Sequence, residues 1–116
     1  MKKLISIVFG TRPELIKLAP VILQAQQDPR FQVEVIFTGQ HDELVRDAID
    51  FFQIKIDHRL KMMNAGQSLN QLLIQGLSQL EGIFNDGQQR NAIIIQGDTT
   101  TVLAAGLVAF SMKIPV

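Results

Sequence analysis

The chain alternates between stretches with the hydrophobic spacing of strands and stretches with the spacing of helices. Residues 4–9 form a continuous apolar run rich in isoleucine and valine, which is typical of a strand covered on both faces. The predicted strands cover residues 4–9, 33–37, 54–60 and 91–96, and the predicted helices cover residues 13–26, 41–52, 68–84 and 99–110. This alternation constrains the fold more than any other feature, because it favours a parallel sheet with helices on both faces.

The predicted sheet is doubly wound, as in an α/β domain of three αβα layers with a Rossmann-like topology. Right-handed crossovers favour the strand order 3-2-1-4, with a fifth strand to follow. The polar-interrupted segment 54–60 is expected at the sheet edge. The last residues are Ile114, Pro115 and Val116, and a proline suits the first residue of a strand. We therefore expect residues 1–116 to stop at the start of a fifth strand, within a longer protein.

The overall composition limits the kinds of binding partner and metal site that the chain is expected to have. Eleven basic and eleven acidic residues cancel, so nothing favours a nucleic-acid or anionic-membrane surface. With no cysteine and two distant histidines, the chain predicts no disulfide, no thiolate metal site and no cysteine nucleophile. The N-terminal apolar run lacks a cleavage site, and the longest apolar stretch, residues 102–110, falls short of the ~20 residues that span a bilayer. We expect a cytoplasmic protein.

Two loops are predicted to meet at the site where an open α/β sheet binds its ligands, beyond the carboxyl ends of strands whose order reverses. They are residues 10–14 and 97–101, and each opens a helix. The first loop has the pattern of a helix cap that Glu14 completes, but capping does not explain Arg12. That arginine either binds an anion, with Gly10 allowing close approach to the backbone, or faces solvent.

Asp98 and His41 each have two interpretations, and His58 has a structural one. Asp98 suits a helix N-cap, and it equally suits acid/base chemistry or a bond to a sugar hydroxyl. His41, with Gln40 beside it, either caps the second helix or reaches a ligand at the same edge of the sheet. His58 lies in the polar edge segment, and we expect a structural role for it.

Four short motifs occur in order along the chain. They are GTRPE-x-IK-x-AP after the first predicted strand, TGQH after the second, M-x-x-G-Q at residues 63–67, and GDTTT before the last helix. Together they resemble the non-hydrolysing UDP-N-acetylglucosamine 2-epimerases. The resemblance implies two Rossmann-like domains facing a cleft, the GT-B architecture, with residues 1–116 as most of the N-terminal domain. The nucleotide-binding domain and further catalytic residues would follow Val116, so the chain alone is expected to be inactive.

The resemblance also implies a reaction at carbon 2 of UDP-N-acetylglucosamine. UDP is lost to give a glycal and then re-adds with inversion of carbon 2, which gives UDP-N-acetylmannosamine for cell-surface polysaccharides. No nicotinamide or metal cofactor is implied. Arg12 and Lys17 would bind the substrate and hold its diphosphate, which leaves and returns. Asp98 would bind the substrate as well, with a catalytic role in acid/base chemistry or positioning.

Some bacterial members of the family bind a second UDP-N-acetylglucosamine as an activator beside the active site. By resemblance, that site would use Gln40, His41 and Gln67. Gly66 stands where such members carry an arginine, and Glu43 stands where a glutamine is common. Full-length members are commonly homodimers, which the resemblance implies here too.

The motifs leave four alternatives. Epimerases of UDP-diacetamido-uronic acids often carry TGQH, but their first loop usually departs from GTRPE. Hydrolysing epimerases also usually differ from TRPE, and a GT-B glycosyltransferase would require an acceptor. A non-catalytic α/β module of the receiver type would need an acidic pair after its first strand, where this chain has Gly10, Thr11 and Arg12.

Overall fold

The computed structural model describes residues 2–39, 43–61 and 66–116. Its elements are β1 (Lys3–Phe9), α1 (Arg12–Gln27), β2 (Phe31–Phe37), α2 (Glu43–Phe52), β3 (His58–Arg59), α3 (Leu69–Phe84), β4 (Ala92–Ile94) and α4 (Thr100–Ser111). The predicted alternation of strands and helices is confirmed. The largest differences from the predicted bounds are in β3 and β4, which are two and three residues long.

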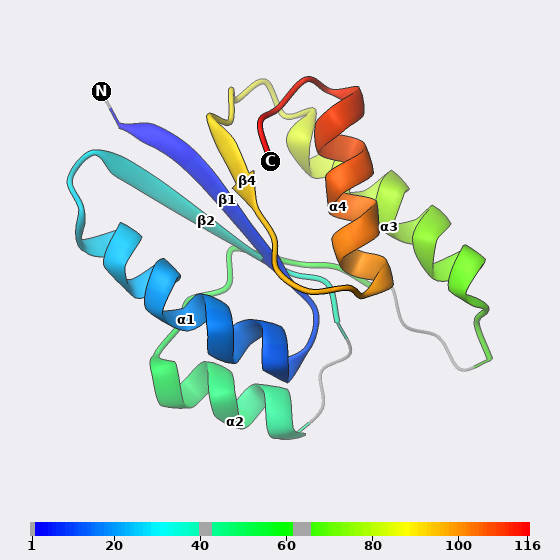
Figure 1. Ribbon diagram of the computed structural model, residues 1–116, viewed down its shortest axis with the longest axis horizontal. Helices are drawn as coiled ribbons and strands as arrows, with labels where there is room; N and C mark the ends of the chain where they lie inside the picture. The colour runs from blue at the N-terminus through cyan, green and yellow to red at the C-terminus, as the bar shows by residue number, and fades with distance from the viewer. Residues whose placement is uncertain (1, 40–42, 62–65) are drawn as a thin grey trace.

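All strand pairs of the sheet are parallel, and the strand order is β3-β2-β1-β4, as predicted. Ile93 of β4 donates a backbone hydrogen bond of 2.8 Å to the carbonyl of Pro115, so the last residues run beside β4. The fifth strand itself stays a prediction. Helices α1 and α2 cover one face of the sheet, and α3 and α4 cover the other (Figure 1).

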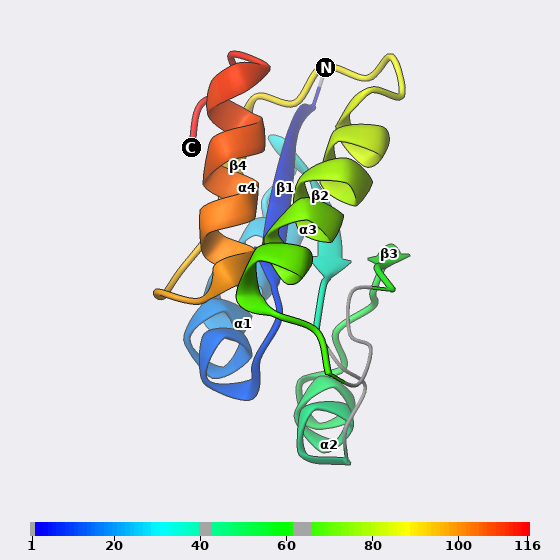
Figure 2. The same ribbon diagram turned by 90° about the vertical axis from the view of Figure 1, so that its right-hand side faces the viewer.

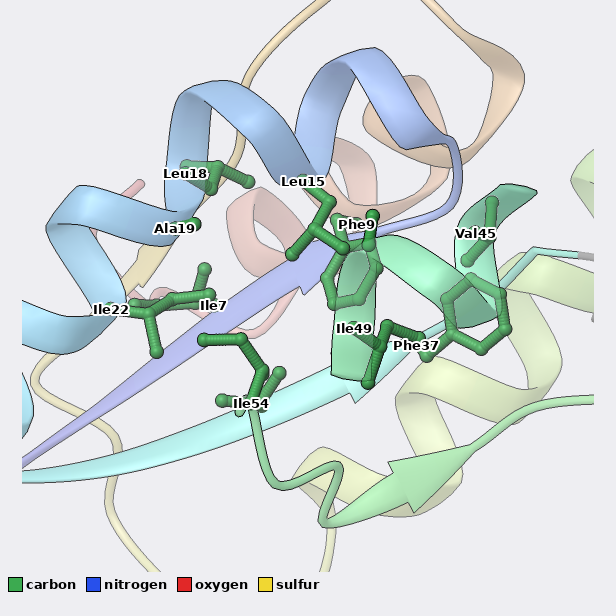
Figure 3. Close-up of a cluster of buried hydrophobic side chains, with 12 residues drawn as sticks. Ile7, Phe9, Leu15, Leu18, Ala19, Ile22, Phe37, Val45, Ile49 and Ile54 are labelled. Carbon is green, nitrogen blue, oxygen red and sulfur yellow. The ribbon is translucent and has the colours of Figure 1, made fainter. Parts of the chain in front are cut away.

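A cluster of buried apolar side chains lies beneath α1 and α2. Figure 3 shows Ile7 and Phe9 of β1 and Phe37 of β2 pointing toward side chains of these two helices. The rings of Phe9 and Phe37 lie 5.2 Å apart between centroids. Ile54, which the sequence placed in a strand, is 6% exposed and packs into this core instead.

The opposite face is covered by α3 and α4, which lie side by side across the sheet (Figure 2). Ala104, Ala105, Val108 and Ala109 give α4 a buried face of small side chains. The sequence of this helix is apolar on nearly every side. In the part of the chain that the structure describes, its outer side chains Leu103, Leu107 and Phe110 are exposed. Across the same residues, no helix combines the length and apolar character needed to cross a membrane.

Strand β3 is shorter than predicted because a side chain takes part in its pairing with β2. The amide of Val35 donates to the carboxylate of Asp57 at 2.8 Å, and the amide of Asp57 donates to the carbonyl of Val35 at 2.9 Å. The ladder proper begins only at His58, opposite Ile36.

A buried ionic network fills the sheet face beneath the end of α3. Arg90, whose side chain is fully buried, donates to both carboxylate oxygens of Glu34 at 3.0 Å and to Asp86 at 2.8 and 3.0 Å. Glu34 also accepts a hydrogen bond from Ser6 and contacts His58 Nε2 at 3.0 Å. His58 therefore has the structural role that the sequence predicted. Arg90 is thus paired with two carboxylates inside the domain.

Candidate functional site

The candidate site lies at the carboxyl edge of the sheet, where β1 and β4 lead into α1 and α4. Both helices begin at the same end of the sheet (Figure 1). Strand β1 pairs with β2 on one side and with β4 on the other, so the crossovers diverge from this point. This is the edge where ligands bind in open α/β sheets.

Glu14 connects the two loops at this edge. It is 3% exposed, and one of its carboxylate oxygens accepts hydrogen bonds from the amides of Gly10 at 2.8 Å and Thr11 at 3.3 Å. The other oxygen accepts the hydroxyl of Thr99 at 2.8 Å, from a residue 85 positions away in the chain. The sequence indicated only a local capping role for Glu14. No local signal could have indicated the bond to Thr99.

A second contact joins the loop after β2 to the same edge. The hydroxyl oxygens of Thr38 and Thr101 lie 3.0 Å apart, and Thr38 is buried. A Cβ atom on Gly39 would lie 1.8 Å from the carbonyl oxygen of Gly10, and one on Gly10 would lie 2.6 Å from Thr38 Oγ1. Gly10 was expected to give a ligand access to the backbone. That expectation is wrong, because Thr38 and Thr101 pack against Gly10. The amide of Gly10 also already donates a hydrogen bond to Glu14.

The charged residues predicted for the site are all exposed. Arg12 begins α1, Lys17 follows farther along the same helix, and Asp98 precedes the N-cap of α4. Within the described residues, none of these three side chains forms a hydrogen bond or an ion pair. Their charges are therefore available to a ligand.

The cap of α4 is Thr99 rather than Asp98. Thr99 Oγ1 accepts a hydrogen bond of 3.4 Å from the amide of Val102. The capping interpretation of Asp98 is therefore wrong. Thr99 has the φ and ψ of the cap, which leaves the preceding carboxylate outside the helix and exposed.

Through Glu14, the loop that carries Arg12 and the loop that carries Asp98 meet at one edge of the sheet. The Arg12 side chain, however, extends toward α2. It lines an open groove of about 450 Å³ between α1 and α2. The other residues that line this groove are Ile16, Leu44, Asp47, Ala48, Phe51 and Phe52. The groove is mostly apolar and so offers few groups to a sugar diphosphate.

The residues predicted for an activator site are only partly described. Gln40 and His41 lie outside the described residues. Gln67 is half-buried and precedes Ser68, the N-cap of α3. Ser68 and Gln71 exchange hydrogen bonds of 2.8 and 3.1 Å, which form a capping box at the start of this helix. Gly66 before it has a positive φ of 80°.

Comparison with known proteins gives one consistent family. A family model described as UDP-N-acetylglucosamine 2-epimerase matches residues 23–116. The UDP-N-acetylglucosamine 2-epimerase of Neisseria meningitidis is 42% identical over 109 residues, which are 94% of this chain and 29% of that protein. The Bacillus subtilis protein of the same name is 38% identical over 117 residues, 100% of this chain and 30% of the relative.

Solved structures agree with these relatives. A crystal structure of UDP-GlcNAc 2-epimerase from Neisseria meningitidis bound to UDP-GlcNAc superposes with a TM-score of 0.91 at 41% identity, covering 97% of this chain and 30% of the other. A structure titled Staphylococcus aureus MnaA with UDP has a TM-score of 0.88 at 34% identity, covering 99% and 30%. The chain thus spans about 30% of the length of the relatives it matches.

Proposed function

This chain belongs to the UDP-N-acetylglucosamine 2-epimerase family, and we propose that it is the N-terminal part of an enzyme that interconverts UDP-N-acetylglucosamine and UDP-N-acetylmannosamine. The observation that carries the proposal is a pair of exposed charges, Arg12 and Asp98, which have no partner among the described residues and lie in two loops that Glu14 joins at the carboxyl edge of the sheet. A cation and a carboxylate at one edge suit a substrate with an anionic diphosphate and a polar sugar.

The proposed reaction inverts carbon 2 of the sugar in two steps. First, a base takes the C2 proton, the electrons of that C–H bond form the C1–C2 double bond of a glycal, and the C1–O bond breaks to release UDP. Second, an oxygen of UDP attacks C1 and C2 takes a proton on the opposite face. Atoms and charge balance without any oxidant or reductant.

Arg12 and Lys17 have the same proposed task in both steps. UDP leaves as an anion and returns as the nucleophile, so a fixed cation near its phosphates lowers the barrier in both directions. Asp98 is proposed to bind the sugar and either to exchange a proton with it or to orient it. Groups outside residues 1–116 complete the site in this proposal, and turnover by the purified 116-residue chain would contradict it.

Two further features belong to the same proposal for the full-length protein. Gln40, His41 and Gln67 are proposed to contact a second, activating UDP-sugar, and the full-length protein is proposed to be a homodimer. Analytical ultracentrifugation tests the dimer, and saturation kinetics with UDP-N-acetylglucosamine test the activation. A monomer, or hyperbolic kinetics unchanged by Gln67→Ala, would overturn the respective part.

The deciding experiment incubates the full-length protein with UDP-N-acetylglucosamine in deuterated water and follows carbon 2 by proton NMR. The expected result is deuterium at C2 together with UDP-N-acetylmannosamine that keeps its nucleotide. Free UDP with free N-acetylmannosamine would instead indicate a hydrolysing epimerase. An unchanged substrate would favour an epimerase of uronic-acid sugars or a glycosyltransferase that needs an acceptor.

A further inference from the structure

Glu14 is an unusual acid for this domain, because it is buried beside the candidate site without a cationic partner. Within the described residues, Glu14 forms no ion pair, whereas the other buried acid, Glu34, pairs with Arg90. Its carboxylate is held by two backbone amides and the Thr99 hydroxyl. Glu14 lies in the first turn of α1, where a carboxylate is favourable because that end of the helix carries partial positive charge. All three of these donors belong to loops of the site.

We propose that Glu14 is a positioning residue of the epimerase site, which holds the loop before Arg12 and the loop of Asp98 in one fixed arrangement through Thr99. The inference rests on the proposed function. Glu14 bonds to the residue next to Arg12 on one side and to the residue next to Asp98 on the other. Because UDP leaves and returns, the group that holds the diphosphate and the group that faces the sugar must keep one geometry through both steps.

The loop that carries Asp98 is shaped to receive the Glu14 carboxylate. Gly97 has a φ of 106°, a conformation that favours glycine, and a Cβ atom there would lie 3.3 Å from Glu14 Oε2. Glycine at this position therefore serves both the turn and the close approach of the carboxylate. The Thr38–Thr101 contact supports the same edge but touches neither of the loops' charged residues.

The geometry predicts which substitutions of Glu14 the site tolerates best. This order distinguishes a positioning role from a role as acid or base. Glu14→Gln keeps the length of the side chain, so its oxygen can accept from Gly10 and Thr11 and its NH₂ can donate to the Thr99 oxygen. Glu14→Asp keeps the charge but is one methylene too short to reach both loops. A positioning residue therefore tolerates Gln better than Asp. An acid or base, or a residue needed for its charge, shows the reverse order.

The test measures kcat and KM of the full-length protein with UDP-N-acetylglucosamine. We expect Glu14→Gln to keep kcat within about tenfold of wild type, the effect of one weakened hydrogen bond. Glu14→Asp and Glu14→Ala should lower kcat about 100-fold, since misplacement by about 1 Å has effects of that size. Thr99→Val should also lower kcat. The double variant with Glu14→Asp should have a kcat little below that of Glu14→Asp alone, because both substitutions remove the same hydrogen bond between the loops.

Two controls separate positioning from general loss of stability. Glu81→Gln changes an exposed acid of α3 and should leave kcat unchanged. Glu34→Gln damages the buried network away from these loops, so it should lower the melting temperature with little effect on kcat. Hydrogen–deuterium exchange of Glu14→Ala should increase in residues 10–16 and 96–102 together, and this readout does not depend on the reaction.

The outcomes distinguish failure of this inference from failure of the proposed function. If the wild-type protein does not epimerise its substrate, the proposed function fails, and the exchange measurement still decides whether Glu14 joins the loops. If the wild type is active, an inactive Glu14→Gln, a fully active Glu14→Asp, or strictly additive effects of the Glu14 and Thr99 variants would each overturn the positioning role.

Discussion

Glu34 and Glu14 are both buried acids, but they lie at different places on the sheet and have different surroundings. Glu34 faces Arg90, Ser6 and His58, and its charge is neutralised inside the domain. Glu14 is held by uncharged donors, while Arg12 and Asp98 beside its loops remain exposed. The first region uses its charges to fix the fold. The second leaves two charged side chains exposed at an edge whose loops are joined by hydrogen bonds, an arrangement that suits the proposed charged ligand.

The pKa values in the network reflect this difference. Burial alone would raise the pKa of Glu34, but hydrogen bonds from Arg90 and Ser6 outweigh burial and lower it. The hydrogen bond from Arg90 also lowers the pKa of Asp86, and both acids in turn raise the pKa of Arg90. Arg90 thus stabilises the charged forms of both acids, and the two acids stabilise the charged form of Arg90.

The strongest way to break the comparison is Arg90→Met in the full-length protein. Removing this cation leaves Glu34 buried without its charge partner, so the free energy of unfolding should fall by about 3–5 kcal/mol. Urea unfolding followed by far-UV circular dichroism measures it. Arg46→Met, at an exposed arginine of α2, should change the same quantity by no more than about 0.5 kcal/mol. Equal stability of the two variants would show that the network does not hold the fold.

Arg12→Ala and Asp98→Asn in the full-length protein test the other region. Each should lower kcat/KM about 100- to 1,000-fold, because in the proposed site each removes a charge that binds the substrate. The melting temperature should stay close to that of the wild type, since neither side chain has a partner in the described chain. Lys55→Ala, at another exposed cation, is the control and should retain activity. A large drop in melting temperature without loss of activity would reverse the assignment of the two regions.

A pair of glycine substitutions sharpens the comparison at the level of packing. Gly39→Ala brings a Cβ atom 1.8 Å from the Gly10 carbonyl, so the loops of the site must shift apart, at a cost of about 1–3 kcal/mol in unfolding free energy and with loss of activity. Gly82→Ala, within α3, meets nothing within 4 Å and should stabilise the protein by about 0.5–1 kcal/mol. Thermal unfolding and epimerase assays of both variants check this. A neutral Gly39→Ala would contradict the close packing of the loops.

Lowering the pH should destabilise the buried ionic network, because two of its acids have lowered pKa values. Glu34 and Asp86 have pKa values below their ordinary values of 4.5 and 3.8, so their contribution to stability is complete above those values. It is lost as the pH falls through the lower values of the folded protein. Urea unfolding at pH 7, 5 and 3 should therefore show a loss below pH 5 that is smaller in Arg90→Met. Parallel curves for wild type and variant would contradict the coupling.

The architecture could be predicted because its signals are local. Hydrophobic periodicity indicated every helix, and the handedness of crossovers then gave the strand order. Strand β3 was overestimated because Asp57 bonds to the β2 backbone through its side chain, and a propensity pattern cannot show that. The exposed outer face of α4 was visible in the sequence as an unusually apolar helix, but its covering was not found in the described residues.

The site could be predicted only in part. The sequence indicated which loops would meet, because the carboxyl ends of parallel strands share one edge of the sheet. It did not distinguish Thr99 from Asp98 as the cap, since both residue types suit that position and they are adjacent. The Glu14–Thr99 bond and the Arg90–Glu34 pair join residues 85 and 56 positions apart, and such pairs leave no pattern in a single sequence.

The length of chain between Glu14 and Thr99 also has a consequence for the order in which the domain is made. Proteins are synthesised from the N-terminus, and contacts between distant residues form late because a long loop must be closed first. Helix α1 can therefore form while the ribosome is still far from residue 99, but its carboxylate has no distant partner until β4 and the start of α4 have emerged. During synthesis, the edge where the loops after β1 and β4 meet therefore cannot be completed before residue 99 has emerged.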